Sequence, residues 1–114
     1  MPSQFDRGLE MRKSVLGEEY VEESFAKATD FDRPVQEFIT EKAWGGVWTR
    51  GPLDKKTKRL ITLSVLVALR AEGEIGLHTR GAINNGVTPD EIVSLLIHAS
   101  AYAGVPAAVS SIKI

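Results

Sequence analysis

The sequence predicts an all-α protein, and three features of the chain support this. Apolar residues recur at intervals of three and four in several segments, which is the spacing of one helix face. Residues that begin or end helices, such as Pro34, Gly86 and Thr88, separate these segments. No segment has the alternation of apolar and polar residues that is typical of a strand. We therefore expect a single helical domain over residues 1–114.

The first two helices are predicted in a strongly charged region. One begins near Asp6 and ends at Leu16, because Gly17 interrupts the pattern. The next covers residues 18–28 and has an imperfect apolar stripe among four glutamates. We interpret the glutamates as a face exposed to water.

A third helix is predicted from Pro34, which suits the first turn of a helix. Its amphipathic pattern continues to Trp44 and Trp48, which are four residues apart and therefore share a face. Gly45 and Gly46 weaken this helix by about 1 kcal/mol each relative to alanine. Small residues there allow a close approach of the backbone to a neighbouring helix or to a ligand.

The fourth predicted helix begins with basic residues and continues as an apolar one. Asp54 is expected to be its N-cap. Its first turns hold basic residues where the helix dipole favours acids, namely Lys55, Lys56, Lys58 and Arg59. They are interpreted either as a basic end in water or as a site for an anion. Nearly every position of residues 60–69 is apolar, so most sides must be covered by the same domain or by another subunit.

Residues 74–86 are where we expect the chemistry. Only here do an acid and a histidine stand at helical spacing between two strongly apolar segments. Glu74 and His78 are four residues apart and would lie one turn from each other on a single helix face. Gly86 follows two asparagines and should close this helix in a left-handed conformation.

The clearest local signal begins the next helix. Thr88 is expected to be its N-cap, and Glu91 completes a capping box. Val87 and Ile92 occupy the two positions of a hydrophobic staple. A further helix is expected to begin within residues 107–114.

Composition excludes several classes of function. The chain has 14 basic and 15 acidic residues and a net charge of -1, whereas nucleic-acid binding needs a basic surface. The absence of cysteine excludes disulfides, thiolate catalysis and thiolate metal ligands. Two histidines without a compact acid cluster give no reason to expect a metal site.

The chain also lacks the signals of export and of membrane insertion. Residues 1–14 have no apolar core of the kind that a secretory signal needs. The longest apolar run, residues 60–69, is about half the ~20 residues of a membrane span. We therefore expect a cytoplasmic protein without a membrane partner. A domain of this size buries only about two-thirds of its unfolded surface, so oligomerisation would stabilise it.

Three stretches together resemble the carboxymuconolactone decarboxylase family, which lies in the wider group of AhpD-like alkylhydroperoxidases. They are the pattern AWGxxWTR from residue 43, LHxRxAxNNGVTxxEI from residue 77, and ASAYAGVPAA over residues 99–108. The combination is specific to the decarboxylase branch, and the resemblance covers roughly residues 5–108. It implies an AhpD-like fold of about six to seven helices and a homohexamer built from dimers.

The other branch of this group differs at its reactive positions. Its peroxidases carry a CxxC pair followed by the histidine that corresponds to His78. Here the two cysteine positions are Ala71 and Glu74, and a glutamate of the peroxidase proton relay corresponds to Arg59. Thiol peroxidase activity therefore does not carry over. Family members usually continue into a full C-terminal helix beyond the position of Ile114.

The resemblance implies decarboxylation of γ-carboxymuconolactone, a dicarboxylate lactone of protocatechuate catabolism, to β-ketoadipate enol-lactone. Electrons released with CO2 can move through the ring double bond to the lactone carbonyl, so no cofactor is expected. The protein must bind a dianion, stabilise charge on the lactone oxygen and deliver a proton to the α-carbon.

His78 is the natural proton donor at neutral pH. Glu74 would orient His78, raise its pKa, or itself be the acid. Arg50 and Arg59 are the candidates for binding the substrate carboxylates, because a guanidinium pairs well with a carboxylate. The alternatives are a core histidine bound to the backbone, an ordinary surface pair and solvated arginines.

Four further residues are candidate contacts of the substrate. Trp44 and Trp48 would form an apolar wall that removes water from the departing carboxylate, although core packing also explains them. Glu41 is a candidate second acid, or a residue that positions Arg50. Asn85 could donate to the lactone oxygen, or simply end its helix. His98 is interpreted as structural.

Two other functions remain open from the sequence. A related lactone or enol isomerase would keep His78 and Glu74 but lack cations for the carboxylates. A non-enzymatic helical oligomer would use its tryptophans and apolar helix only for packing. A cavity that contains His78, Arg50 and Trp48 would exclude this last alternative.

Overall fold

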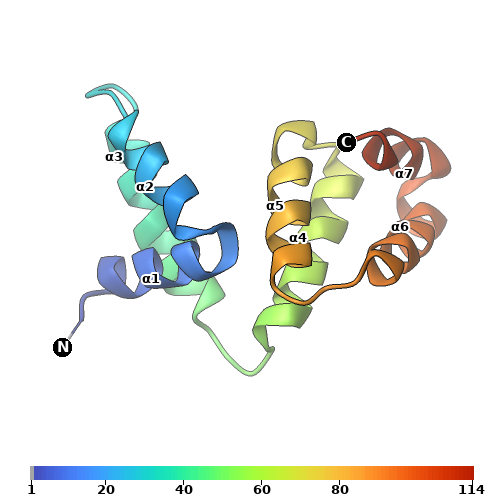
Figure 1. Cartoon of the computed structure of the whole chain (residues 1–114), viewed down its shortest axis with the longest axis horizontal. Helices are drawn as coiled ribbons and strands as arrows, with labels where there is room; N and C mark the ends of the chain where they lie inside the picture. The colour runs from blue at the N-terminus through green and yellow to red at the C-terminus, as the bar shows by residue number, and fades with distance from the viewer. Residues whose placement is uncertain (1) are drawn as a thin grey trace. The chain divides into compact units, whose positions relative to one another are not determined.

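The computed structural model describes residues 2–114, which form seven α-helices and one π-helix and contain no strand (Figure 1). The all-α prediction is confirmed for this part of the chain. The helices fall into two compact units that meet in sequence between Leu53 and Asp54, and each is described by itself. The first contains α1 (Gln4–Leu16), α2 (Glu18–Ala26), α3 (Arg33–Phe38) and η1 (Ile39–Trp48). The second contains α4 (Lys55–Leu69), α5 (Glu72–Asn84), α6 (Pro89–Ala103) and α7 (Val105–Ile112).

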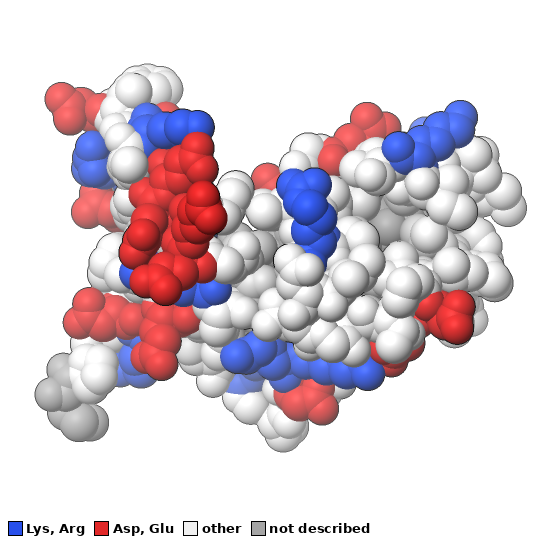
Figure 2. Space-filling model, in the orientation of Figure 1, with Lys and Arg blue, Asp and Glu red and all other residues white. Residues whose placement is uncertain are grey.

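Helix α1 begins earlier than the prediction placed it, because Ser3 caps it. The Ser3 hydroxyl accepts a hydrogen bond from the Asp6 amide at 3.0 Å, and the Asp6 carboxylate accepts one from the Ser3 amide at 3.4 Å. This is a capping box with aspartate in place of the usual glutamate or glutamine. Gly17 ends α1 with a φ of 100°, which confirms the predicted break. In Figure 2 the acidic side chains gather over this unit, where the exposed glutamates of α2 lie.

Two glycines let α1 and η1 pack backbone to backbone. A Cβ atom added at Gly8 would collide with the carbonyl oxygen of Thr40 and lie 2.7 Å from the amide nitrogen of Gly45. A Cβ atom on Gly45 would collide with the carbonyl oxygen of Gln4. The close approach predicted at Gly45 is therefore made to a helix of the same unit.

The core of the second unit is built on α4, which contacts the other three helices. Its Leu63 and Val67 are each 2% exposed. Buried apolar side chains of α5, α6, α7 and the α5–α6 connection pack with them, namely Ile75, Ala82, Val87, Leu96 and Ala107. Such burial is the main favourable contribution to folding.

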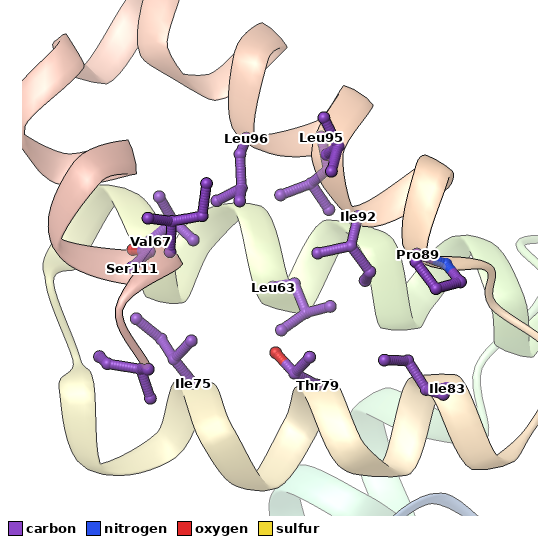
Figure 3. Close-up of a pocket in the computed structure, with 13 residues that line it drawn as sticks. Leu63, Val67, Ile75, Thr79, Ile83, Pro89, Ile92, Leu95, Leu96 and Ser111 are labelled. Atoms are coloured by element: carbon purple, nitrogen blue, oxygen red, sulfur yellow. The ribbon is translucent and has the colours of Figure 1, made fainter.

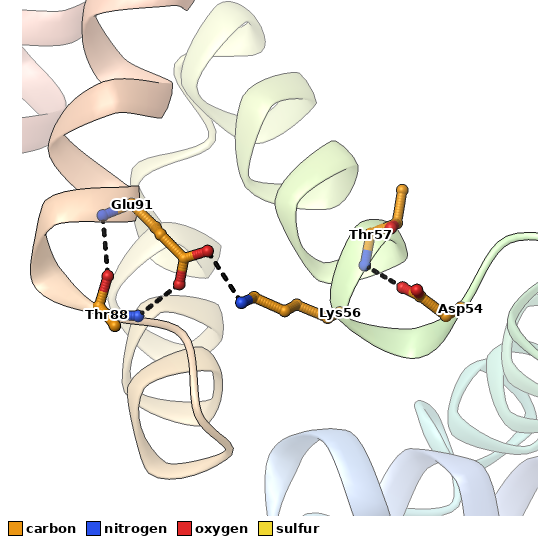
Figure 4. Close-up of polar contacts among 5 residues, drawn as sticks. All are labelled: Asp54, Lys56, Thr57, Thr88 and Glu91. Carbon is orange, nitrogen blue, oxygen red and sulfur yellow. Dashed lines mark hydrogen bonds and ion pairs between the residues drawn. The ribbon is translucent and has the colours of Figure 1, made fainter.

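Capping interactions fix the N-termini of α4 and α6 (Figure 4). The Asp54 carboxylate accepts a hydrogen bond from the Thr57 amide at 2.7 Å, which confirms the predicted N-cap. The capping box of Thr88 and Glu91 is confirmed, with hydrogen bonds of 2.9 and 3.1 Å. Glu91 also pairs with Lys56 of α4 at 2.8 Å. That pair and the Thr88 amide hold the pKa of Glu91 below its usual value.

The remaining local predictions for this unit hold, with one shift. Gly86 has a φ of 98°, as expected for a residue that closes α5. Val87 is buried and packs with Ile92, which confirms the hydrophobic staple. The last helix, α7, begins at Val105, two residues before the predicted start, because Gly104 ends α6 with a φ of 97° and Pro106 fits the first turn of α7.

One side of α4 is not covered by its own domain, so cover of that side by another subunit, the other alternative that the sequence left open, stays a prediction. Ile61, Val65 and Leu69 are 47%, 49% and 71% exposed. Further large apolar side chains are exposed on α6 and α7, and the second unit presents few charged atoms on much of the face drawn in Figure 2. Within residues 2–114, no helix combines the length and apolarity that crossing a membrane requires.

Candidate active site

His78 lies on α5 with only 11% of its side chain exposed. Burial lowers the pKa of its imidazole below the usual value of a histidine, and the charge of Arg59 lowers it further, while Glu74 acts in the opposite direction. The effect of Glu74 was expected from the sequence, but burial outweighs it. His78 is therefore neutral in most molecules of the free protein at pH 7.

Glu74 lies one helical turn before His78, as predicted. The distance from its Oε2 atom to Nε2 of His78 is 4.0 Å, which suits an ion pair but is too long for a hydrogen bond. The Glu74 side chain is 59% exposed. It can stabilise an imidazolium at this distance.

Arg59 is one of the few buried charged residues of the described chain, with an exposed fraction of 4%. Its Nη1 atom donates to the carbonyl oxygen of Gly81 at 2.8 Å, which joins α4 to the last turn of α5. Asn85 donates from Nδ2 to the same oxygen at 2.7 Å. Direct contacts of Arg59 and Asn85 with a substrate stay predictions. The sequence did not single out Gly81, and only its place in a final helical turn, where carbonyls lack backbone partners, could have indicated it.

The remaining predicted site residues belong to the first unit. Trp44 and Trp48 stack, with ring centroids 4.9 Å apart and an angle of 21° between the rings. Their segment continues helically as predicted, but as a π-helix, a rare form that is frequent at functional sites. The Glu41 carboxylate lies 3.6 Å from the ammonium of Lys42. Arg50 follows η1 at an exposed position. A cavity shared by these residues and His78 stays a prediction.

An apolar cavity of about 230 Å³ opens between the helices of the second unit (Figure 3). Ile75, Thr79 and Ile83 line it from α5, and the other helices contribute mainly aliphatic side chains. Neither His78 nor any basic residue is part of its lining. Because an unpaired carboxylate is costly to bury, this cavity does not suit a dianion.

The second histidine differs from the first. His98 is exposed on α6, beside Tyr102, with ring centroids 5.6 Å apart. It is therefore not a core histidine of this chain. Among residues 2–114, no three or more His, Asp, Glu or Cys side chains are grouped so that they could hold a metal ion.

Comparison with known proteins gives the family of this chain. Residues 33–114 match the model of the Carboxymuconolactone decarboxylase family. The chain belongs to the carboxymuconolactone decarboxylase family. The match includes α4 and α5, and thus His78, Glu74 and Arg59.

Two curated relatives are similar to the chain along most of their own length. The chain is 52% identical over 107 residues to the nitrosuccinic acid decarboxylase npaB of Metarhizium robertsii, a match that covers 94% of this chain and 75% of the relative. It is 47% identical over 103 residues to the 4-carboxymuconolactone decarboxylase of Acinetobacter baylyi, with 90% and 77% coverage. Both relatives are named decarboxylases, and decarboxylation is the class of reaction that this chain catalyses.

Proposed function

We propose that the chain decarboxylates γ-carboxymuconolactone to β-ketoadipate enol-lactone, a step in the breakdown of aromatic compounds. The observation that carries the proposal is a largely buried histidine with an acid one turn away, in a chain 47% identical to a 4-carboxymuconolactone decarboxylase. The isomerase and the non-enzymatic oligomer, which the residues alone left open, lose their support because both relatives are decarboxylases.

The substrate supplies the electron sink for this reaction. The bond between the γ-carbon and its carboxylate breaks, and the electron pair moves through the ring double bond onto the lactone oxygen. The dienolate is then protonated at the α-carbon, which leaves a double bond between the β- and γ-carbons. The protein accelerates this sequence by stabilising the dienolate and by supplying the proton.

His78 is the proposed proton donor. A bound dianion is an opposite charge, which favours the imidazolium and so loads His78 with a proton as the substrate enters. Glu74 would stabilise that imidazolium from 4.0 Å. The proposed roles of Arg50 for the carboxylates, of Trp44 and Trp48 as an apolar wall, and of Glu41 as a second acid rest on the sequence.

This sequence of events predicts the pH dependence of the rate. Both kcat and kcat/KM should fall as pH rises, because the imidazolium is the donor. The fall in kcat/KM reports the free protein, where burial and Arg59 keep the pKa of His78 low. The fall in kcat reports the complex, where the dianion raises that pKa, so it should begin at higher pH. Rates measured across the pH range test this, and coincident profiles would contradict it.

A second candidate substrate is nitrosuccinic acid, which the 52% identity to a nitrosuccinic acid decarboxylase favours. It is also a dicarboxylic acid, and its nitro group can accept the electron pair of the leaving carboxylate. The resulting nitronate is protonated on carbon, which requires the same proton donor. Both reactions require a proton donor, which is the role proposed for His78.

Release of CO2 from the two substrates tests the proposal. We expect a higher kcat/KM with γ-carboxymuconolactone than with nitrosuccinic acid. A higher kcat/KM with nitrosuccinic acid would identify that compound as the substrate. If neither compound released CO2, the proposed function would be wrong.

We also propose that the protein is a homo-oligomer, a hexamer by the family resemblance. The exposed apolar side chains of α4, α6 and α7 support this, because large apolar patches on a soluble chain mark contact surfaces. They include Ile61, Leu69, Ile97, Val105 and Ile112. Light scattering of the purified protein measures the assembly mass directly, and a monomeric mass would contradict the proposal.

A further inference from the structure

The carbonyl oxygen of Gly81 accepts two side-chain hydrogen bonds. Arg59 Nη1 donates to it from α4 at 2.8 Å, and Asn85 Nδ2 donates to it at 2.7 Å. Gly81 belongs to the last four residues of α5, whose carbonyls have no amide partner in the helix. A carbonyl oxygen has two lone pairs, so these two donors satisfy it fully. The final turn of α5 is thereby attached to α4.

The same arginine acts on His78. Gly81 follows His78 by three residues, so both lie within about one turn of α5. In the second unit the charges that act on the imidazole are those of Glu74, on the same helix, and of Arg59, on α4. Arg59 opposes protonation of His78 and Glu74 favours it.

Burying Arg59 has a cost. An arginine with 4% exposure has lost most of its hydration, and a buried charge destabilises a fold unless hydrogen bonds compensate for that loss. An apolar side chain would cover α4 and α5 at lower cost. The hydrogen bond of Arg59 to the Gly81 carbonyl, three residues after His78, is one role that a buried cation at this point fulfils.

We propose that Arg59 is a positioning residue for His78: it holds the last turn of α5 through the Gly81 carbonyl and keeps a fixed positive charge near the imidazole. This inference rests on the proposed role of His78 as proton donor. It differs from the sequence-based prediction that Arg59 binds a substrate carboxylate. A residue that only binds the substrate would not change the pKa of His78 in the free protein.

The test is an NMR titration of the His78 imidazole without substrate, with Arg59→Gln compared against the unaltered chain. The pKa of His78 should rise in the variant, because a cation that disfavours the imidazolium is gone. The matched control is Arg80→Gln, which removes an exposed arginine from α5 two residues after His78 and should leave that pKa unchanged. The His98 signal is assigned with a His98→Gln variant.

Steady-state kinetics supply the second measurement. Misplacing a reacting group costs about 10- to 100-fold in rate, so Arg59→Gln should lower kcat by that factor with little change in KM. A raised KM with an unchanged kcat would identify a carboxylate ligand and overturn the proposal. An unchanged pKa of His78 in a folded variant would also overturn it.

Asn85→Ala keeps the test decisive if Arg59→Gln does not fold. It removes the other donor to Gly81 from a surface position and leaves all charges in place. We expect shifted NMR signals of the His78 imidazole in the substrate-free variant together with a lower kcat, because loss of a substrate contact alone would leave the free protein unaltered. Unchanged His78 signals would show that the Gly81 carbonyl does not position His78. If the unaltered chain released no CO2, the titration would still decide whether Arg59 acts on His78, so failure of the two proposals can be told apart.

Discussion

His78→Ala is expected to lower kcat by about 100-fold or more while the protein stays folded. General acid catalysis by a positioned side chain contributes about 10²- to 10⁴-fold to the rate, and alanine cannot deliver a proton. The change keeps a good helix former on α5, so the helix should persist. Steady-state release of CO2 measures the loss, and circular dichroism with the assembly mass establishes that the fold is intact.

The second histidine provides the matched control. His98 is exposed on α6 in the same unit and has no assigned part in the reaction. His98→Ala should therefore retain nearly full activity. Equal losses in the two variants would show that a general effect of removing a histidine, and not proton delivery by His78, causes the defect.

Gly8→Ala is expected to destabilise the first unit by about 2 kcal/mol or more. The added methyl group would collide with backbone atoms of Thr40 and Gly45, which cannot move without displacing η1 from α1. Overpacking of this kind usually costs about 1–3 kcal/mol, and rigid backbone atoms place this case at the upper end. Because η1 carries Trp44 and Trp48, activity should fall with stability.

Urea unfolding followed by circular dichroism measures this change, and Gly73→Ala is its matched control. A Cβ atom at Gly73 meets no other atom within 4 Å, and the residue is the second of helix α5. Alanine there should leave the stability unchanged or raise it slightly, because alanine favours the helix more than glycine does. If Gly8→Ala unfolded at the same urea concentration as the unaltered chain, the close packing of α1 on η1 would be wrong.

Local structural features that depend on residues close together in the chain could be predicted from the sequence. The N-caps Asp54 and Thr88, the glycine breaks at Gly17 and Gly86, and the i, i+4 pair of Glu74 and His78 each depend on a few consecutive side chains. They were predicted for that reason, and the structure confirms them.

Features that depend on distant residues were not predictable in the same way. The burial of Arg59 depends on α5, 22 residues further along the chain at Gly81, and no local pattern distinguishes it from its solvated neighbours. The same holds for Gly8. This position must be glycine because the backbone of η1 leaves no space for a side chain. The low pKa of His78 likewise follows from burial, which spacing alone does not reveal. No local sequence pattern indicates that η1 is a π-helix and not an α-helix.

The most direct test of proton delivery by His78 is turnover of γ-carboxymuconolactone in D2O, with the product examined by NMR. A positioned donor delivers its proton to one face of the dienolate. We predict one deuterium at the α-carbon of the enol-lactone, in a single configuration. An equal mixture of the two configurations would mean that the dienolate is protonated by solvent, and would contradict the assignment of His78.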